Sequence, residues 1–153
     1  MKKYICICLL LVLCTGLVAC GQLEDTNGEQ ETGLATLTKE ELVATFTGSS
    51  TIGTFHSKAG DTLSYKALKL SGVVVLDSIK VTDQASKLIV SVQSQLERGN
   101  LCIYLRCDGK ILGQFTPGQS DSLTLEQPTP GQYELCVAGE SAKFELSATI
   151  QAE

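Results

Sequence analysis

The feature that most constrains the fold is an alternation of apolar and polar residues with a period of two. The clearest stretches are residues 87–93 and 143–150, in which apolar residues occupy every second position. Successive side chains of a β-strand point to opposite faces, so this pattern predicts strands with one buried and one exposed face. No stretch after residue 50 keeps a helical period over three turns.

Further short runs of strand-forming residues recur between turn signals such as Ala59-Gly60-Asp61, Asp108-Gly109 and Pro130-Gly131. These runs lie at about 51–57, 62–70, 73–81, 100–107, 110–115, 121–126 and 132–138. The alternation slips near Asp77, which predicts a β-bulge. The sequence therefore predicts an all-β domain over residues 45–153, an antiparallel β-sandwich or jelly roll of about 8–9 strands.

Length and charge exclude several classes of protein. The chain has 153 residues, which leaves room for one domain and argues against a multidomain enzyme. Its net charge is -5. Binding to duplex nucleic acid needs a clustered basic surface, and this acidic composition does not provide one. We expect no nucleic-acid partner.

The N-terminus has the order of an export signal. Lys2 and Lys3 precede an apolar stretch over residues 4–18, which is too short to cross a bilayer comfortably. The stretch ends in Leu17-Val18-Ala19-Cys20-Gly21, which resembles the lipobox of bacterial lipoproteins. This resemblance implies a signal peptide over residues 1–19 and a lipid anchor, with fatty acyl chains such as palmitate, on Cys20.

A lipidated Cys20 places the protein on the exported side of a bacterial cell membrane, at the surface or in the periplasm. Two or three acyl chains hold a protein stably on a bilayer. An ordinary secretory signal and an uncleaved membrane anchor are the open alternatives. The residue after Cys20 is Gly21, so the chain lacks the Asp that retains some Gram-negative lipoproteins at the inner membrane. The sequence does not decide whether the envelope has a second membrane.

The residues after the signal are polar and acidic. We expect residues 20–44 to form a flexible tether, because the stretch over residues 21–33 is too poor in apolar residues to offset the entropy of ordering. Thr38-Lys39-Glu40-Glu41 has the spacing of a capping box and predicts at most a short helix.

Residues 50–153 resemble a jelly-roll layout of apolar positions and turns. The residues that carry the resemblance are Asn100 to Gly109, Pro130 to Val137 and Phe144-Glu145-Leu146. They are similar to bacterial pre-peptidase C-terminal domains and related modules of secreted proteins. The resemblance implies a jelly-roll β-sandwich and no particular activity.

The chain offers little for catalysis. The sole imidazole, His56, lies beside Ser57, and adjacent residues of a strand point to opposite faces, so we expect a lone surface histidine. Turn carboxylates are conceivable calcium ligands, but no Asp-x-Asp-x-Asp loop joins them; they are Asp61, Asp83, Asp108 and Asp121. We predict no catalytic residue, no metal and no cofactor.

Apart from the lipidated Cys20, three cysteines remain after the signal: Cys102, Cys107 and Cys136. Cys102 and Cys107 lie on opposite faces of one strand, which excludes a bridge between them. Antiparallel pairing of residues 100–107 with 132–138, implied by the jelly-roll resemblance, sets Cys102 opposite Cys136 if Asp108 lies near Pro130. Three free thiols are the equal alternative.

The sequence does not identify a binding site. Tyr104 and Arg106 share the outward face of their strand and are the weak candidates for binding, whereas Tyr133 falls in phase with the core. We expect a lipid-anchored envelope or cell-surface protein with a non-catalytic binding or spacer module. The alternative is a carbohydrate-binding or accessory subunit of a cell-wall hydrolase, and the partner, protein or glycan, is open.

Overall fold

The computed structural model describes residues 33–44 and 48–153. These residues contain one short helix and six strands, which confirms the all-β class. The elements are α1 (Lys39–Val43), β1 (Ser49–Ala59), β2 (Thr62–Val81), β3 (Lys87–Cys107), β4 (Lys110–Phe115), β5 (Ser120–Glu126) and β6 (Gly131–Ala152). Every run that the sequence predicts as a strand lies inside one of the six.

The six strands form one antiparallel sheet in the order β1-β2-β6-β3-β4. The strand β5 pairs with the N-terminal part of β3, on the side that β4 occupies further along. The strand number is lower than the predicted 8–9 because β2, β3 and β6 are 20–22 residues long, and each joins two predicted runs.

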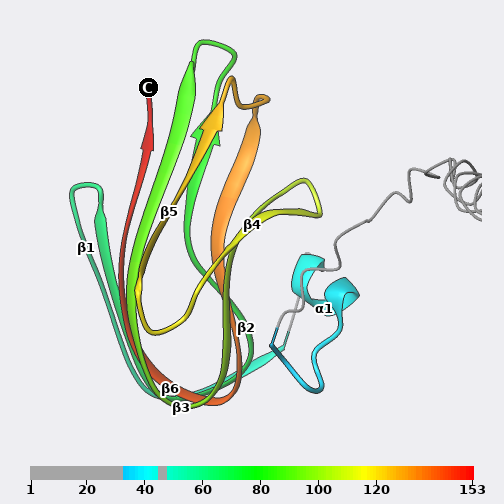
Figure 1. Cartoon of the computed structure of the whole chain (residues 1–153), viewed down its shortest axis with the longest axis vertical. Helices are drawn as coiled ribbons and strands as arrows, with labels where there is room; N and C mark the ends of the chain where they lie inside the picture. The colour runs from blue at the N-terminus through cyan, green and yellow to red at the C-terminus, as the bar shows by residue number, and fades with distance from the viewer. Residues whose placement is uncertain (1–32, 45–47) are drawn as a thin grey trace, which may run out of the picture. The chain divides into compact units, whose positions relative to one another are not determined.

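The long strands bend in their middle, as Figure 1 shows at the foot of β2, β3 and β6. Glycines and irregular pairing mark the bend: Gly72 and Gly99 have positive φ, and the β3–β6 register shifts around Arg98. We call the two halves of the sheet the first arm and the second arm. The first arm comprises 49–59, 62–70, 87–96, 120–126 and 142–152, and the second arm comprises 73–81, 101–107, 110–115 and 131–138.

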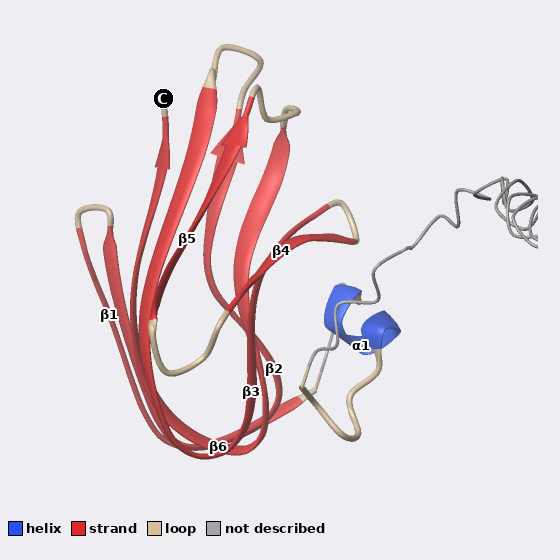
Figure 2. Ribbon diagram, in the orientation of Figure 1, coloured by secondary structure: helices blue, strands red, loops and turns tan. Residues whose placement is uncertain are grey.

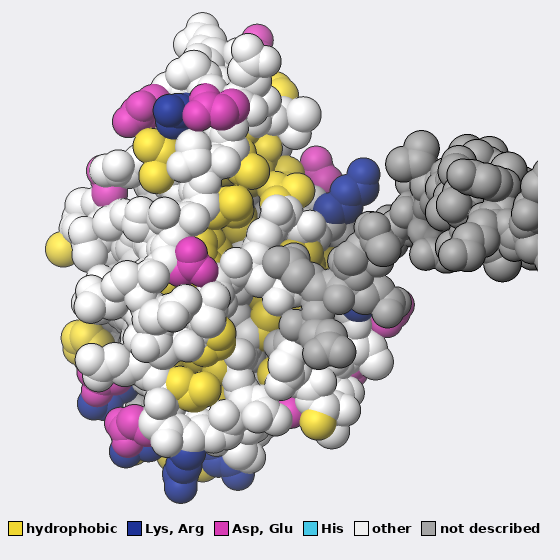
Figure 3. Space-filling model, viewed as in Figure 1, with side chains coloured by type: hydrophobic (Ala, Val, Ile, Leu, Met, Phe, Trp, Pro, Cys, Tyr) yellow, Lys and Arg dark blue, Asp and Glu magenta, His cyan; other side chains and the backbone are white. Residues whose placement is uncertain are grey.

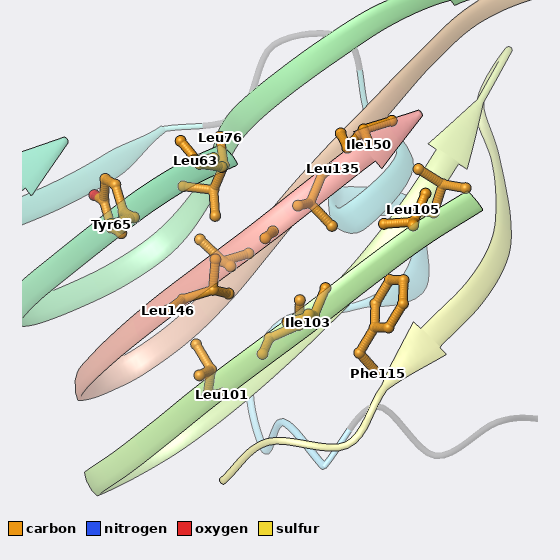
Figure 4. Close-up of a cluster of buried hydrophobic side chains, with 14 of the residues drawn as sticks. Leu63, Tyr65, Leu76, Leu101, Ile103, Leu105, Phe115, Leu135, Leu146 and Ile150 are labelled. Carbon is orange, nitrogen blue, oxygen red and sulfur yellow. The ribbon is translucent and has the colours of Figure 1, made fainter. Parts of the chain in front are cut away.

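The main core lies between the inner faces of the two arms. Leu146 and Tyr65 of the first arm belong to one buried cluster with Ile103 and Leu135 of the second arm. Figure 4 shows these side chains of β2, β3 and β6 in one cluster, together with Phe115 of β4. The predicted alternation is confirmed, since Leu88, Val90, Val92, Phe144, Leu146, Ala148 and Ile150 are all buried.

Two local predictions are also confirmed. The β2–β6 register shifts between Val75 and Asp77, which is the predicted bulge, and Asp77 forms an ion pair with Lys58 at 2.7 Å. Asp108 and Gly109 form the two-residue turn between β3 and β4, both with positive φ. Such a turn matches the twist of the two strands that it joins.

Pairing of β3 with β6 is confirmed, but the expected register is wrong by two residues. Cys102 lies opposite Ala138, and Cys136 lies opposite Tyr104. A shift of two residues leaves every side chain on its predicted face, so alternation does not distinguish the two registers. The turn residues do not decide it either, because β4 and β5 separate β3 from β6 in the chain.

The helix α1 begins at the predicted capping box. The Thr38 hydroxyl accepts a hydrogen bond from the Glu41 amide, and the Glu41 carboxylate accepts one from the Thr38 amide. Figure 2 shows α1 as the only helix among the residues that are drawn in colour. Because it has five residues, its stability must come from packing rather than from its own hydrogen bonds.

Candidate functional site

The predicted candidates Tyr104 and Arg106 are not exposed. Both point outward from β3, as their phase predicts, but their exposed fractions are 0% and 5%. Residues 34–44, which we expected to belong to a flexible tether, cover them. Leu42 is fully buried there and forms a second apolar cluster with Val73, Cys102, Tyr104, Cys136 and Ala138. We call this outward side of the second arm the covered face.

Polar groups of the covered face bind the end of α1. The Tyr104 hydroxyl donates a hydrogen bond to the Leu42 carbonyl oxygen at 2.8 Å. The Arg106 Nη1 group donates to the carbonyl oxygens of Leu42 and Ala44, both at 2.9 Å. Its Nε group lies 2.7 Å from Oε2 of Glu134. Arg106 therefore satisfies carbonyls that a helix end leaves unpaired, which makes it a structural residue.

Glu140 binds the chain before α1. Its carboxylate accepts hydrogen bonds from the amides of Ala35, Thr36 and Leu37, and from Asn100. These bonds favour the ionised form and lower the pKa of Glu140 from 4.5 to about 2. Residues 35–37 are thereby fixed to the sheet at neutral pH.

The three cysteines are free and buried. The Cys102–Cys136 bridge is not formed, and Cys107 is a thiol at the end of β3, on the inner face as predicted. Burial raises the pKa of Cys102 to about 11 and that of Cys136 to about 12. These thiols are therefore poor nucleophiles in the folded chain.

One feature of the sequence indicates that both faces of β3 are covered over residues 101–107. Residues 101–107 are buried without interruption, and outward positions such as Cys102 and Tyr104 carry apolar or aromatic side chains. A strand that is buried on both faces has a continuous apolar run rather than an alternating one. The run LCIYLRC therefore indicated a strand with both faces covered.

The outward side of the first arm is different. The partners in the sheet place three rows of side chains side by side, one across β1, β2, β6 and β3, and two that continue to β5. The rows are Phe55, Lys66, Glu145 and Gln95; Ser57, Ser64, Ser147, Gln93 and Ser120; and Ala59, Thr62, Thr149, Ser91 and Ser122. We call this surface the open face, because every one of these residues is exposed or half-buried.

Two adjoining hollows lie on the open face. One has a volume of about 450 Å³ and is lined by residues of β3, β5 and β6, including Ser91, Ser122 and Thr149. The other has a volume of about 360 Å³ and is lined by Phe55, Lys66 and Glu145 among others. Gln93 and Ser147 border both hollows, which makes them one continuous shallow depression.

The other residues considered for chemistry lie apart. His56 is exposed on β1 and packs edge-on against Tyr65, with ring centroids 5.9 Å apart. Within residues 33–44 and 48–153, no three His, Cys, Asp or Glu side chains come together as a metal site. Cys20, the predicted lipidation site, lies outside the described residues. The one helix of the described part is not a candidate to span a bilayer.

Comparison with known proteins does not assign the chain to a family. No protein-family model matches the chain, and no curated protein is detectably similar to it.

Proposed function

We propose that this chain is a lipid-anchored protein of a bacterial envelope or cell surface, and that its sheet domain is a non-catalytic binding module. The anchor is the predicted diacylglyceryl cysteine, Cys20. The observation that carries the binding role is the open face, a broad polar depression on a rigid sheet. Ligand sites are typically hollows in a scaffold that is already formed, where a few placed polar groups fix the orientation of the ligand.

We also infer that the domain is a jelly-roll β-sandwich, as its resemblance to pre-peptidase C-terminal domains implies. The bend of the three long strands supports this inference, because it lets the inner faces of both arms contribute to one apolar cluster.

The alternative function is a carbohydrate-binding or accessory subunit of a cell-wall hydrolase. One observation favours it: the exposed aromatic ring of Phe55 stands at the edge of the depression. An aromatic face on a sheet is a stacking platform for a sugar ring. A spacer that binds no ligand requires neither the polar depression nor the exposed ring of Phe55.

Anchoring is tested by replacing Cys20 with Ala and labelling cells with a radioactive fatty acid. We expect the wild-type chain to be labelled and to stay with membranes in high salt, because insertion of acyl chains is hydrophobic and is not screened. Labelling of Cys20→Ala as strong as that of the wild type would contradict the anchor.

Binding through the open face is tested by affinity capture from native membranes. Ser147→Arg places a long charged side chain at the centre of the open face, and Thr82→Arg adds the same charge in the exposed β2–β3 turn. We expect Ser147→Arg to lose the captured ligand and Thr82→Arg to keep it. Equal capture by both variants would contradict binding at this face, and hydrolysis of envelope material by the isolated chain would contradict a non-catalytic role.

A further inference from the structure

We infer that the open face binds a neutral, extended polysaccharide whose chain runs across the strands from β1 toward β5. The inference rests on the proposed function, since it takes the open face as the binding site and names its ligand. Hydroxyls and amides supply most of its polar groups, and one exposed aromatic ring stands at its β1 end.

The charges of the open face argue for a neutral ligand. Lys66 and Glu145 are the two charged residues of its rows, and they form an ion pair with each other. Asp121 also lines one hollow, and its carboxylate accepts hydrogen bonds from the amides of Thr116 and Ser122. No unpaired charge of the rows is therefore left to attract an ionic ligand, and the net charge of the chain repels polyanions. On the side of the molecule shown in Figure 3, charged side chains also form small groups among uncharged ones.

The polar groups that remain are suited to sugars. Serine and threonine hydroxyls both donate and accept hydrogen bonds, and the amides of Gln93 and Gln95 do the same. Sugar hydroxyls also have both roles, so each can pair with whichever partner it meets. The rows are formed by residues that are direct partners in the sheet, so these groups recur at the strand spacing of about 4.7–4.9 Å.

The strand spacing also predicts the direction of the polysaccharide. The spacing is close to the length of one sugar unit in an extended polysaccharide, so a polysaccharide that crosses the strands meets an equivalent position of a row at each unit. In the two rows that reach β5, four strand separations span about 19 Å, whereas the row of Phe55 ends at β3 and spans about 14 Å. A row that reaches β5 holds about four sugar units.

Phe55 orients the ligand. Its exposed fraction is 60%, and it lies opposite Lys66 at the β1 end of its row. Phe55 differs from the other exposed apolar side chains in being aromatic and in lining a hollow, and the apolar face of a sugar ring can stack on it. Ile52 is the matched control, because it lies on the same strand with an exposed fraction of 58% and lines neither hollow.

The experiment uses affinity electrophoresis of the full chain in native gels. The gels contain the neutral polysaccharide fraction of the native envelope, its acidic fraction, or a soluble β-glucan. We expect retardation by a neutral polysaccharide, about tenfold weaker binding for Phe55→Ala, and unchanged binding for Ile52→Ala. Calorimetry with oligosaccharides of the retarding polymer should show affinity that rises up to about four units and then levels off.

The outcomes separate this inference from the proposed function. If Ser147→Arg loses a captured protein while no neutral polysaccharide retards the wild type, the polysaccharide ligand is refuted and the binding face stands. Retardation by the acidic fraction alone also refutes it. If neutral polysaccharides retard the wild type and Ser147→Arg equally, the open face is the wrong site and both proposals fall.

Discussion

The outward faces of the two arms differ in composition and in what covers them, although the same three long strands form both. On the second arm, most outward positions of β3 and β6 carry apolar or aromatic side chains, and together with Val73 of β2 these form a cluster that residues 34–44 cover. On the first arm, the outward positions of the same strands carry hydroxyls, amides and one ion pair, and the described residues leave them accessible. A single sheet thus has one outer face that is covered by the chain itself and one that the described residues leave accessible.

The largest difference is expected between two apolar truncations. Leu42→Ala removes a fully buried side chain from the covered face and should lower the free energy of unfolding by about 2–5 kcal/mol. Phe55→Ala removes a larger but exposed side chain from the open face and should change it by no more than about 0.5 kcal/mol. Urea unfolding measures both, and similar losses would contradict the division into two faces.

Thiol reactivity reports the cover directly. Burial raises the pKa of Cys102 and of Cys136 far above 8, so few of these thiols are ionised at pH 8. Alkylation by iodoacetamide should therefore be slow in the wild type and faster in Leu42→Ala, with Phe55→Ala as the control that keeps the wild-type rate. Mass spectrometry of the labelled peptides measures it. Rapid labelling of Cys136 in the folded wild type would show that residues 34–44 do not cover it.

Hydroxyls on the two faces should also differ. Tyr104→Phe removes the buried hydrogen bond to Leu42 and should cost about 0.5–1.5 kcal/mol of unfolding free energy. Ser147→Ala removes a hydroxyl from the open face and should be nearly neutral for stability. Thermal and urea unfolding of the two variants test this. A larger loss for Ser147→Ala would mean that the open face is structural.

The smallest effect concerns the pH dependence of the Glu140 contacts. Its pKa is lowered on folding, so its contribution to stability is present above pH 4.5 and is lost as the pH falls toward 2. The stability advantage of the wild type over Glu140→Gln should therefore shrink across this window. Amide exchange at Ala35 and Thr36 provides the local measure, and an advantage that is independent of pH would contradict the role of the carboxylate.

Much of the strand structure could be predicted from sequence. Alternation places Leu88 and Phe144 on the inner face, the turn at Asp108-Gly109 is readable from its residues, and the phase slip identifies the bulge at Asp77. The short helix follows from the capping-box spacing at Thr38. These features depend on neighbours in the chain, which is why local reasoning reaches them.

The predicted exposure of Tyr104 failed for a different reason. Period two tells which side of a strand a residue lies on, but not what covers that side. The cover comes from residues 34–44, about 60 residues earlier, which the prediction joined to the polar stretch over residues 21–33 although Leu34, Leu37 and Leu42 are apolar and pack against the sheet. Glu140 and Arg106 bind its backbone, and backbone contacts leave no trace in the composition of the segment that is bound.

The sequence by itself determined the all-β class, the positions of the strands, their inner faces and several turns, because the residues that decide them are close together in the chain. Only the tertiary structure decided the register of β3 against β6, the cover over Tyr104 and the alignment of hydroxyls across five strands. A shift of two residues keeps each side chain on the same face of the sheet, so the alternation pattern does not distinguish the two registers. Rows across a sheet exist only once that register is set.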